Sequence, residues 1–167
     1  SKPEKLFGHL PIAKIQISHD VDAINKTNSI RFKQSIFLLF NSLRCLGKLN
    51  FKAFLSKFKC SFYFLLRTSD WSKCIYKTIQ ILNDFHYKST FNFFARCEKL
   101  SIKNFIFNPS YDVNSIELKN IANFIKKKNF KIGLHQSYDS WKNKNKIIKE
   151  KRYIEKNLNV KITSCRQ

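Results

Sequence analysis

The alternation of apolar and polar positions predicts four β-strands. In residues 13–18, Ile15 and Ile17 alternate with polar side chains, which is typical of a half-buried strand. The other segments with strand composition are residues 89–95, 131–135 and 160–165. Between these segments the apolar period changes to that of amphipathic helices. The order of strands and helices predicts parallel strands joined by crossover helices.

Three helices are expected in these connections. They are residues 72–85, a helix that begins near Asn114, and residues 147–158. Asn114 is expected to cap its helix, and Glu117 three residues later completes a capping-box pattern. The apolar face of the first helix consists of Ile75, Ile79 and Leu82. The apolar stripe of the second consists of Leu118, Ile121, Ala122 and Ile125.

Residues 30–67 differ from the rest, because long stretches rich in Phe and Leu carry helical spacing without a strand. A break at Gly47 and Asn50 divides them into two predicted helices, which form an insertion after the first strand. A connection of this length without secondary structure would be unusual in a compact domain. We expect lysines outward and the following side chains inward: Phe37, Leu38, Phe51, Phe54 and Phe58. The insertion is a candidate to cover the barrel, or to contact an anionic glycan or membrane surface through its lysines, with packing alone as the simpler alternative.

The length of 167 residues and the 43% of hydrophobic residues are enough for one core. We therefore expect a single α/β domain over residues 1–167, with residues 30–67 as an insertion within it. No uninterrupted apolar stretch approaches the roughly 20 residues that a membrane-spanning helix needs.

A pair of carboxylates follows the first predicted strand, in the sequence SHDVD at residues 18–22. Asp20 and Asp22 are two positions apart, so both point to the same side if the chain stays extended. The carboxyl ends of parallel strands are where α/β folds place their active sites. One carboxylate can bind a cation while the other accepts a proton from water. The simpler interpretation is a turn in which one of them caps a helix.

His135 ends the third predicted strand, and Asp139 follows four residues later. In a helical turn this spacing places the imidazole and the carboxylate on one face. With Asp22 they make a mixed set of oxygen and nitrogen ligands, which suits Zn²⁺ and also Mn²⁺, Co²⁺ or Fe²⁺. For His135 alone, the alternative is a hydrogen-bonded residue of the core.

Four ordered motifs resemble the polysaccharide deacetylases of the NodB-homology, carbohydrate esterase type. SHDVD at residues 18–22 resembles the first motif of that family, and GLHQSYDS at residues 133–140 resembles its His-x-x-x-His motif. A divergent branch associated with surface polysaccharides is similar in two further features. These are the STFNFF strand at residues 89–94 and the Glu-Lys helix that leads into Arg166 and Gln167.

The resemblance implies a distorted, seven-stranded (β/α) barrel with parallel strands. It implies a metal-dependent hydrolase that removes N-acetyl, or O-acetyl, groups from a polysaccharide or amino-sugar glycan. Asp20 would be the general base, Asp22 and His135 metal ligands, and Arg166 the residue that orients the base. Asp139 stands where the family has its second His, which puts metal binding by three ligands in question. The candidates for sugar contacts, with packing as the alternative for each, are Tyr111, Ser137, Tyr138 and Trp141.

The same resemblance predicts that the chain is the amino-terminal part of a larger barrel and is inactive alone. About three further strands would be needed to close the barrel. In the family a His from a later motif is the general acid, and general acid catalysis contributes about 10²–10⁴-fold. This chain stops before such a motif, and His9, His19 and His86 are poor substitutes.

Two other functions remain open, one suggested by the charge of the chain and one by its Asp-x-Asp pair. There are 32 Lys and Arg residues against 11 Asp and Glu, giving a formal net charge of +21. Lys, Asn, Ile and Phe are all encoded by A/T-rich codons, so this charge is explained by genome composition on a solvated surface. A nucleic-acid-binding module is the alternative, but no motif for specific recognition is present. A metal-dependent glycosyltransferase is the other alternative, because an Asp-x-Asp pair also holds Mn²⁺ on a nucleotide sugar.

Five cysteines without regular spacing argue against a disulfide framework and a Cys-rich zinc site. They favour the reducing cytoplasm. The chain begins at Ser1 and contains no Met, so a removed signal peptide is the open alternative.

Overall fold

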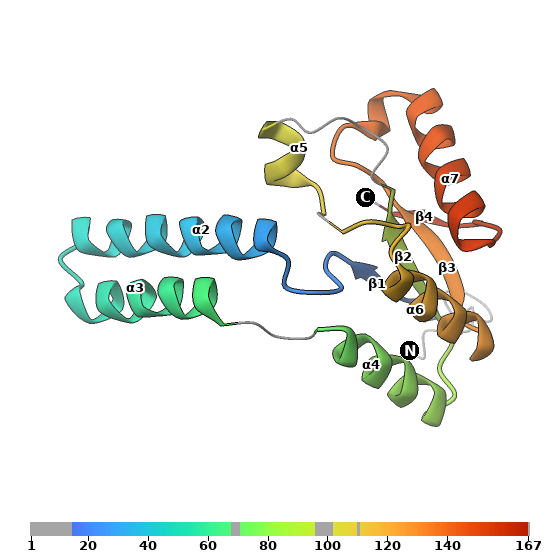
Figure 1. Ribbon diagram of the computed structural model, residues 1–167, viewed down its shortest axis with the longest axis horizontal. Coiled ribbons are helices and arrows are strands. Elements are labelled where there is room, and N and C mark those ends of the chain that lie inside the picture. The colour runs from blue at the N-terminus through green and yellow to red at the C-terminus, as the bar shows by residue number, and fades with distance from the viewer. Residues whose placement is uncertain (1–14, 68–70, 96–101, 110, 167) are drawn as a thin grey trace, which may run out of the picture.

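The computed structural model describes residues 15–67, 71–95, 102–109 and 111–166. In these residues four parallel strands form one sheet, whose spatial order follows the sequence (Figure 1). The strands are β1 (Ile17–Val21), β2 (Ser89–Phe94), β3 (Lys131–His135) and β4 (Cys165–Arg166). Helices alternate with these strands, so the predicted α/β class is confirmed. Consecutive parallel strands in spatial order are consistent with a partial (β/α) barrel.

Helices occupy the connections, and each predicted helix is present. These are α4 (Ser72–Asp84), α6 (Ile116–Lys127) and α7 (Lys144–Leu158). Helix α7 begins three residues before its predicted start, because the side chain of Asn143 caps it at the backbone N–H of Lys146. Two short elements were not predicted. They are α5 (Ile102–Phe107) after β2 and the 3₁₀ helix η1 (Ser140–Lys142) after β3.

The core is formed by the sheet, α6 and α7, and α4 packs against α6. Every residue of β2 is buried, as expected for a strand covered on both faces. The predicted stripe of α6 is confirmed, because all of its members are at most 1% exposed. The predicted face of α4 is confirmed as well, with Ile79 and Leu82 buried and Ile75 partly buried against the core.

Helix α6 uses a different cap from the predicted one. The hydroxyl of Ser115 accepts a hydrogen bond from the backbone N–H of Leu118 at 3.3 Å. The side chain of Asn114 instead donates to the hydroxyl of Tyr153 at 2.9 Å. Neighbouring Asn and Ser residues are both good caps, so the pattern located the helix start only to within one residue.

Two strands differ from their predicted bounds by more than one residue. Strand β1 continues to Val21, so Asp20 lies inside the strand and pairs in register with Asn92 of β2. Strand β4 begins at Cys165, at the end of the predicted segment 160–165. Its pairing partners are Leu134 and His135 of β3, so tertiary pairing sets where this strand begins. The predictions for His9, Cys97 and Gln167 lie outside the described residues.

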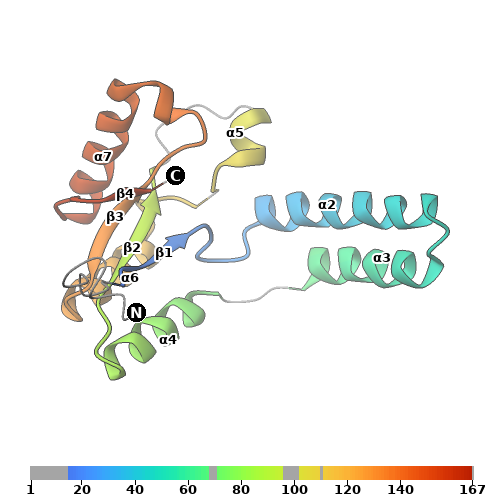
Figure 2. The same cartoon turned by 180° about the vertical axis from the view of Figure 1, so that it is seen from behind.

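The insertion after β1 is a helical hairpin, as predicted. Helices α2 (Asn28–Gly47) and α3 (Phe51–Leu66) run antiparallel and project away from the sheet (Figures 1 and 2). At the base of the hairpin, the guanidinium of Arg31 donates hydrogen bonds to the carbonyl oxygens of Leu65 and Leu66. These are carbonyls that the end of a helix leaves without intrahelical partners.

Serine residues form the seam between α2 and α3. Ser35 and Ser61 each donate a hydrogen bond to the backbone carbonyl of the other, at 3.0 and 2.8 Å. Ser42 donates to the carbonyl of Phe54 at 2.9 Å. All three serines are buried. We call this contact the serine seam.

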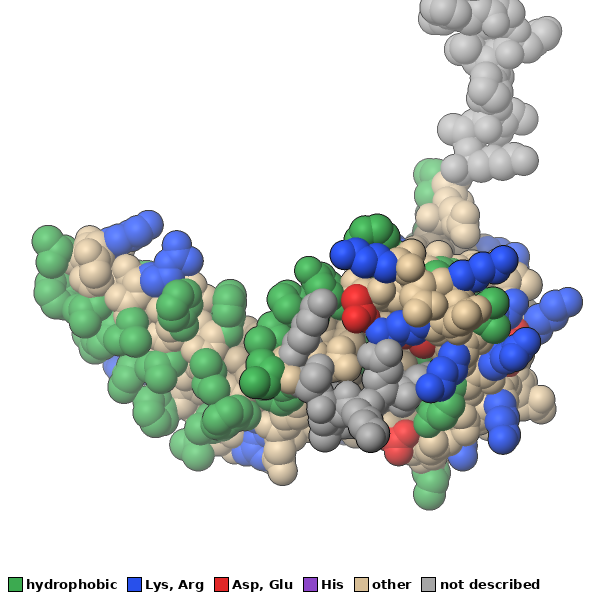
Figure 3. Space-filling model, turned by 90° about the horizontal axis from the view of Figure 1, so that it is seen from above, with side chains coloured by type: hydrophobic (Ala, Val, Ile, Leu, Met, Phe, Trp, Pro, Cys, Tyr) green, Lys and Arg blue, Asp and Glu red, His purple; other side chains and the backbone are tan. Residues whose placement is uncertain are grey.

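The predicted inward packing of the large hairpin side chains is therefore wrong for most of them. Phe37, Phe51 and Phe58 are 57%, 59% and 37% exposed, whereas Leu38 and Phe54 are partly buried. Small side chains let two helices approach closely, which leaves no room for rings between them. Hydrophobic side chains consequently cover much of the projecting arm (Figure 3). No helix in the described ranges combines the length and apolar character needed to cross a bilayer.

Candidate active site

The ends of β1 and β3 bring two predicted metal ligands together. Asp22 directly follows β1, and His135 is the last residue of β3. Nε2 of His135 lies 3.4 Å from Oδ1 of Asp22, and the two side chains are 19% and 72% exposed. The predicted approach of these residues is confirmed, at a position open to solvent.

His135 presents an unprotonated nitrogen to Asp22 when its ring is neutral. Its Nδ1 lies 2.9 Å from the carbonyl oxygen of Gln136. A carbonyl oxygen can only accept, so this contact assigns the proton to Nδ1 and the lone pair to Nε2. Two electron-rich atoms then face each other, and a cation between them would satisfy both. Metal-binding His residues commonly donate their other N–H to a backbone carbonyl in this way.

The separation of these atoms also suits a divalent cation. Two ligands at about 2.0–2.1 Å from a tetrahedral Zn²⁺ lie about 3.3–3.4 Å apart. The observed distance between Nε2 of His135 and Oδ1 of Asp22 is 3.4 Å. These two donors therefore fit one half of a tetrahedral site.

Asp20 is held by side chains from β2, its neighbouring strand, and from β4, at the other end of the strand order. Its Oδ1 accepts a hydrogen bond from Nδ2 of Asn92 in β2 at 2.9 Å. Its Oδ2 lies 3.3 Å from Nε of Arg166 in β4, and Nη1 of Arg166 also donates to the hydroxyl of Ser18 at 2.7 Å. The carboxylate is 25% exposed. The predicted contact of Arg166 with Asp20 is confirmed, whereas Asn92 was not predicted.

Gly133 leaves the space that the Asn92 side chain occupies. The two residues are partners in the register of β2 and β3. A Cβ atom on Gly133 would lie 2.1 Å from Oδ1 of Asn92 and 2.8 Å from the hydroxyl of Ser164. Any larger residue would have to displace the group that orients Asp20. The glycine of GLHQSYDS is therefore explained by close approach rather than by an unusual backbone angle.

Asp139 does not join the pair formed by Asp22 and His135. Tyr138 and Asp139 lie in a turn, not in the helical turn that the spacing predicted, and Asp139 makes an ion pair with Lys146 of α7. Among the described residues, no group of three His, Cys, Asp or Glu side chains lies close enough to hold a metal ion. The expected third ligand is thus not supplied by Asp139 in this arrangement.

Ser137 and Tyr111, two predicted sugar contacts, are buried at 2% and 4% exposure. The hydroxyl of Ser137 donates to the carboxylate of Glu150, which is itself 1% exposed and also accepts from the Ser137 backbone N–H. The hydroxyl of Tyr111 accepts a hydrogen bond from the backbone N–H of Phe94 at 2.6 Å. Burial raises the pKa of Tyr111 well above its usual range. Both predictions of sugar contact are corrected, because these side chains position the loops beside the sheet.

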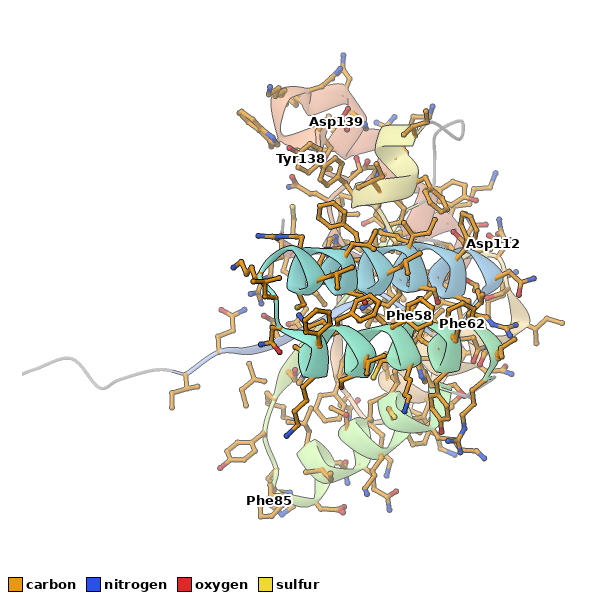
Figure 4. All side chains as sticks on the ribbon, turned by 90° about the vertical axis from the view of Figure 1, so that its left-hand side faces the viewer. Phe58, Phe62, Phe85, Asp112, Tyr138 and Asp139 are labelled. Atoms are coloured by element: carbon orange, nitrogen blue, oxygen red, sulfur yellow. The ribbon has the colours of Figure 1, made fainter. Side chains whose placement is uncertain are left out.

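A pocket lies beside Asp22 and His135, and Tyr138 contacts two residues of its wall without lining it. The pocket has a volume of about 340 Å³. Its lining includes Asp22, Ile30, Lys33, Phe107, Asn108 and His135. The ring of Tyr138 stacks on Phe107 with centroids 4.3 Å apart, and its backbone N–H donates to Asn108. Tyr138 lies beside α5 in Figure 4 and is 48% exposed. This stacked pair is an accessible aromatic platform next to the site.

Lys33 brings a positive charge from the first turns of α2 to this pocket. Burial lowers the pKa of Lys33, and the negative charge of Asp22 partly opposes that effect. Trp141 lies elsewhere on the surface, 60% exposed and with the ammonium of Lys142 4.8 Å from its ring centre. The hairpin therefore contributes to the pocket, and Trp141 is not among the residues that line it.

Sequence reasoning missed four residues that shape the site. Asn92 carried a signal, since it is an isolated polar residue in the strand STFNFF. Glu150 belonged to a motif, but nothing in its position along the chain indicated a buried partner. Phe107 and Asn108 lie in a segment without strand or helix periodicity, so no pattern pointed to them.

Comparison of the chain with protein-family models, with curated proteins and with solved structures gave no match. The functional interpretation therefore depends on the motifs and on the geometry of the site.

Proposed function

We propose that this chain carries the catalytic face of a metal-dependent hydrolase that removes acetyl groups from a polysaccharide or amino-sugar glycan. The observation that carries the proposal is the pairing of two differently held carboxylates at one end of a parallel sheet. Asp20 is fixed by Asn92 and Arg166, while Oδ1 of Asp22 lies 3.4 Å from Nε2 of His135.

Asp20 is the general base in this proposal. Hydrogen bonding to Asn92 and the ion pair with Arg166 hold its carboxylate in one orientation. Each carboxylate oxygen has a further lone pair, so Asp20 can accept a proton from an attacking water while these contacts persist. Arg166 and Asn92 are positioning residues, because they act on the base and not on the substrate.

Asp22 and His135 would hold the divalent cation, with Zn²⁺ favoured by the mixed donors and Mn²⁺, Co²⁺ or Fe²⁺ as alternatives. Such a cation, when bound, lowers the pKa of water and polarises a carbonyl oxygen. The open flank of Asp22 allows the carbonyl of an acetyl group to approach the site. The backbone N–H of Gln136 donates to the Arg166 carbonyl, so β3 and β4 stay joined next to His135.

The pocket suits a sugar. Phe107 at its wall stacks on Tyr138, which extends the apolar surface beyond the pocket, and Asp22 and Asn108 provide polar groups at its wall. Sites for small ligands commonly combine apolar and aromatic walls with a few polar groups that fix orientation. As part of this proposal, the four strands belong to a distorted barrel of the deacetylase type.

The test measures Zn²⁺ affinity by calorimetry and acetate release from an acetylated chitooligosaccharide, in the full-length protein. Asp22→Asn and His135→Ala should each weaken metal affinity, by about 10-fold or more. Asp20→Asn should retain metal binding but lose about 10²–10⁴-fold in acetate release. Asp84→Asn, an exposed carboxylate at the end of α4, is the control and should change neither quantity.

Asp139→Asn tests whether Asp139 is a third metal ligand. We expect unchanged Zn²⁺ affinity, because the Asp139 carboxylate pairs with Lys146.

The proposed site would be refuted if Asp22→Asn and His135→Ala left the metal stoichiometry unchanged. Binding of a UDP-sugar with Mn²⁺ and no acetate release would instead indicate a glycosyltransferase. Selective binding of one nucleic-acid structure, without acetate release, would indicate a nucleic-acid-binding module.

A further inference from the structure

Large apolar side chains form one stripe along each helix of the hairpin. In α2 the stripe consists of Phe32, Ile36, Phe40, Leu43 and Leu46. In α3 it consists of Phe51, Leu55, Phe58, Phe62 and Leu66. These side chains are between 37% and 73% exposed. We call the two stripes together the hairpin face.

The two stripes lie on the same side of the hairpin. Residues three or four apart share one face of a helix, and each stripe lies about a quarter turn from the serine seam. Viewed from the N-terminus of each helix, the stripe lies on the same rotational side of the seam in α2 and in α3. Because the two helices are antiparallel, both stripes come to one side of the hairpin. The hydrophobic side chains gather along one side of the projecting arm in Figure 3, and Phe58 and Phe62 are neighbours on α3 in Figure 4. Their ring centroids are 5.0 Å apart.

The polarity of the hairpin is the reverse of that expected for a helix pair in water. Its seam is built from Ser35, Ser42 and Ser61, all buried, while rings and aliphatic side chains point outward. Small residues at the seam and hydroxyl hydrogen bonds between helices are characteristic of helices packed in lipid. The described residues of the body provide no cover for this face, since its side chains remain exposed.

The charge of the hairpin is entirely positive. Residues 28–67 contain no Asp or Glu. Their cationic residues are Arg31, Lys33, Arg44, Lys48, Lys52, Lys57, Lys59 and Arg67. Helical spacing places Arg44 along the edge of α2 that is away from α3, and Lys52 and Lys59 along the opposite edge of α3. The guanidinium of Arg44 lies 6.0 Å from the ring centre of Phe40. The hairpin face is thus bordered on both edges by long cationic side chains.

A second copy of the chain would fit this surface poorly. Face-to-face packing of two hairpins would bring two sets of cations together without an acidic residue from either, and like charges across an interface are unfavourable. An anionic bilayer offers the complementary charge. Apolar side chains enter the boundary of headgroups and acyl chains, while Lys and Arg extend to the phosphates.

We propose that the hairpin face docks on an anionic membrane, with α2 and α3 lying in the plane of the interface. Neither helix is able to span the bilayer, so the hairpin lies on the surface. This proposal is independent of the proposed hydrolase activity.

The test is flotation of the full-length protein with phosphatidylcholine vesicles that do or do not contain phosphatidylserine. A double variant, Phe58→Gln with Phe62→Gln, removes apolar character from the face without changing charge. Phe85→Gln is the matched control, because Phe85 is 68% exposed at the end of α4, outside the hairpin. We expect the double variant to reduce binding to the anionic vesicles by at least about 10-fold, and the control to stay within about twofold.

The net charge alone attracts the protein to anionic vesicles, so the measurement is repeated in about 1 M salt, where the Debye length is about 3 Å. Binding by the parent and by Phe85→Gln should persist in part, whereas binding by the double variant should disappear. Circular dichroism checks that the helices of the variants are retained. Phe58→Trp should also show a blue-shifted emission on addition of vesicles, and Phe85→Trp should not.

Several results would overturn the proposal. Equal vesicle binding by the double variant and the Phe85→Gln control would show that electrostatic attraction alone accounts for the binding. Absence of binding by the parent protein to phosphatidylserine vesicles would exclude the membrane. A lipid-free dimer that dissociates in the double variant would show that a second copy covers the face.

Vesicle binding that depends on Phe58 and Phe62 but survives Asp20→Asn would support membrane docking separately from catalysis.

Discussion

The sheet-containing body and the hairpin are both rich in large apolar side chains. The helices of the body bury them against a core, whereas the helices of the hairpin leave many of them exposed to solvent. In α6 of the body, Leu118 and Ile121 face the core and are fully buried. In α3 of the hairpin, Leu55 and Phe62 point outward and are 52% and 50% exposed, while Ser61 is buried. Helix α6 has one apolar face and one polar face, whereas α3 carries apolar side chains around most of its circumference, so the two helices differ in sequence as well as in surroundings.

This contrast shows what an apolar stripe indicates. A stripe identifies the face of a helix that is favourably removed from water, but it does not say what covers that face. In the body the cover is the sheet. In the hairpin the described residues provide none, and the cover that we propose is an anionic membrane.

The largest expected effect comes from a matched pair of leucines. Leu118→Ala should lower the free energy of unfolding by about 2–5 kcal/mol, because it opens a cavity in the core. Leu55→Ala should change it by less than about 0.5 kcal/mol, because Leu55 is half exposed. Urea denaturation followed by circular dichroism measures both. A loss at Leu55 as large as that at Leu118 would mean that the hairpin face is covered in the full protein.

A matched pair of glycines gives the next largest effect. Gly133→Ala should cost about 1–3 kcal/mol, because its Cβ would overlap Asn92 and Ser164. The same change should shift the side-chain amide resonances of Asn92, since its contact with Asp20 must move. Gly47→Ala, at the end of α2, meets no atom within 4 Å and should stabilise the hairpin by up to about 0.5–1 kcal/mol. A neutral Gly133→Ala would show that the site is looser than its contacts imply.

The serine seam is expected to contribute a smaller amount. Ser61→Ala removes the hydroxyl that donates to the Ser35 carbonyl and should weaken the hairpin by about 0.5–1.5 kcal/mol. Ser56→Ala, at an exposed position of the same helix, is the control. Amide hydrogen exchange along α2 and α3 reports the difference. Equal exchange in the two variants would argue that the seam hydrogen bond makes no net contribution.

The smallest effect is a pH dependence from the body. His19 stacks on Phe91 with ring centroids 4.9 Å apart, and burial lowers its pKa below the ordinary value of 6.5. The unfolded chain therefore binds a proton near pH 6.5 that the folded chain does not, so stability falls as the pH drops through 6.5. The fall ends below the folded pKa. His19→Phe should have a flatter stability profile than the parent between about pH 7 and 5, measured by urea denaturation. Identical profiles would mean that His19 titrates alike in both states.

The elements of the body were largely predictable, but the end of β1 and the start of β4 were not. The bounds of β3 and the buried stripe of α6 followed from local periodicity, because apolar side chains at the right spacing must face a core. The end of β1 and the start of β4 depend on which residues pair across strands, as Asp20 does with Asn92. Such pairing joins segments far apart in the chain.

The site shows the same division. Asp22 and His135 were predicted to meet because each ends a strand, and parallel strands bring their carboxyl ends to one edge. The prediction for Asp139 was wrong because it assumed a helical turn, whereas Asp139 lies in a tight turn closed by the hydrogen bond from Ser140 N–H to the Ser137 carbonyl, and its carboxylate pairs with Lys146. The role of Gly133 depends on Asn92 in a neighbouring strand, so its spacing from His135 carried no information about it.

By itself, the sequence determined the helices and strands, the apolar faces and the residue types available for chemistry, because these depend on neighbours within a few positions. The tertiary structure decided which faces are covered and which carboxylate receives which partner. In the hairpin, it placed Ser35, Ser42 and Ser61 between the helices and left the rings outside. Close approach of two helix backbones requires small side chains, and no local pattern states which of two possible faces makes that approach.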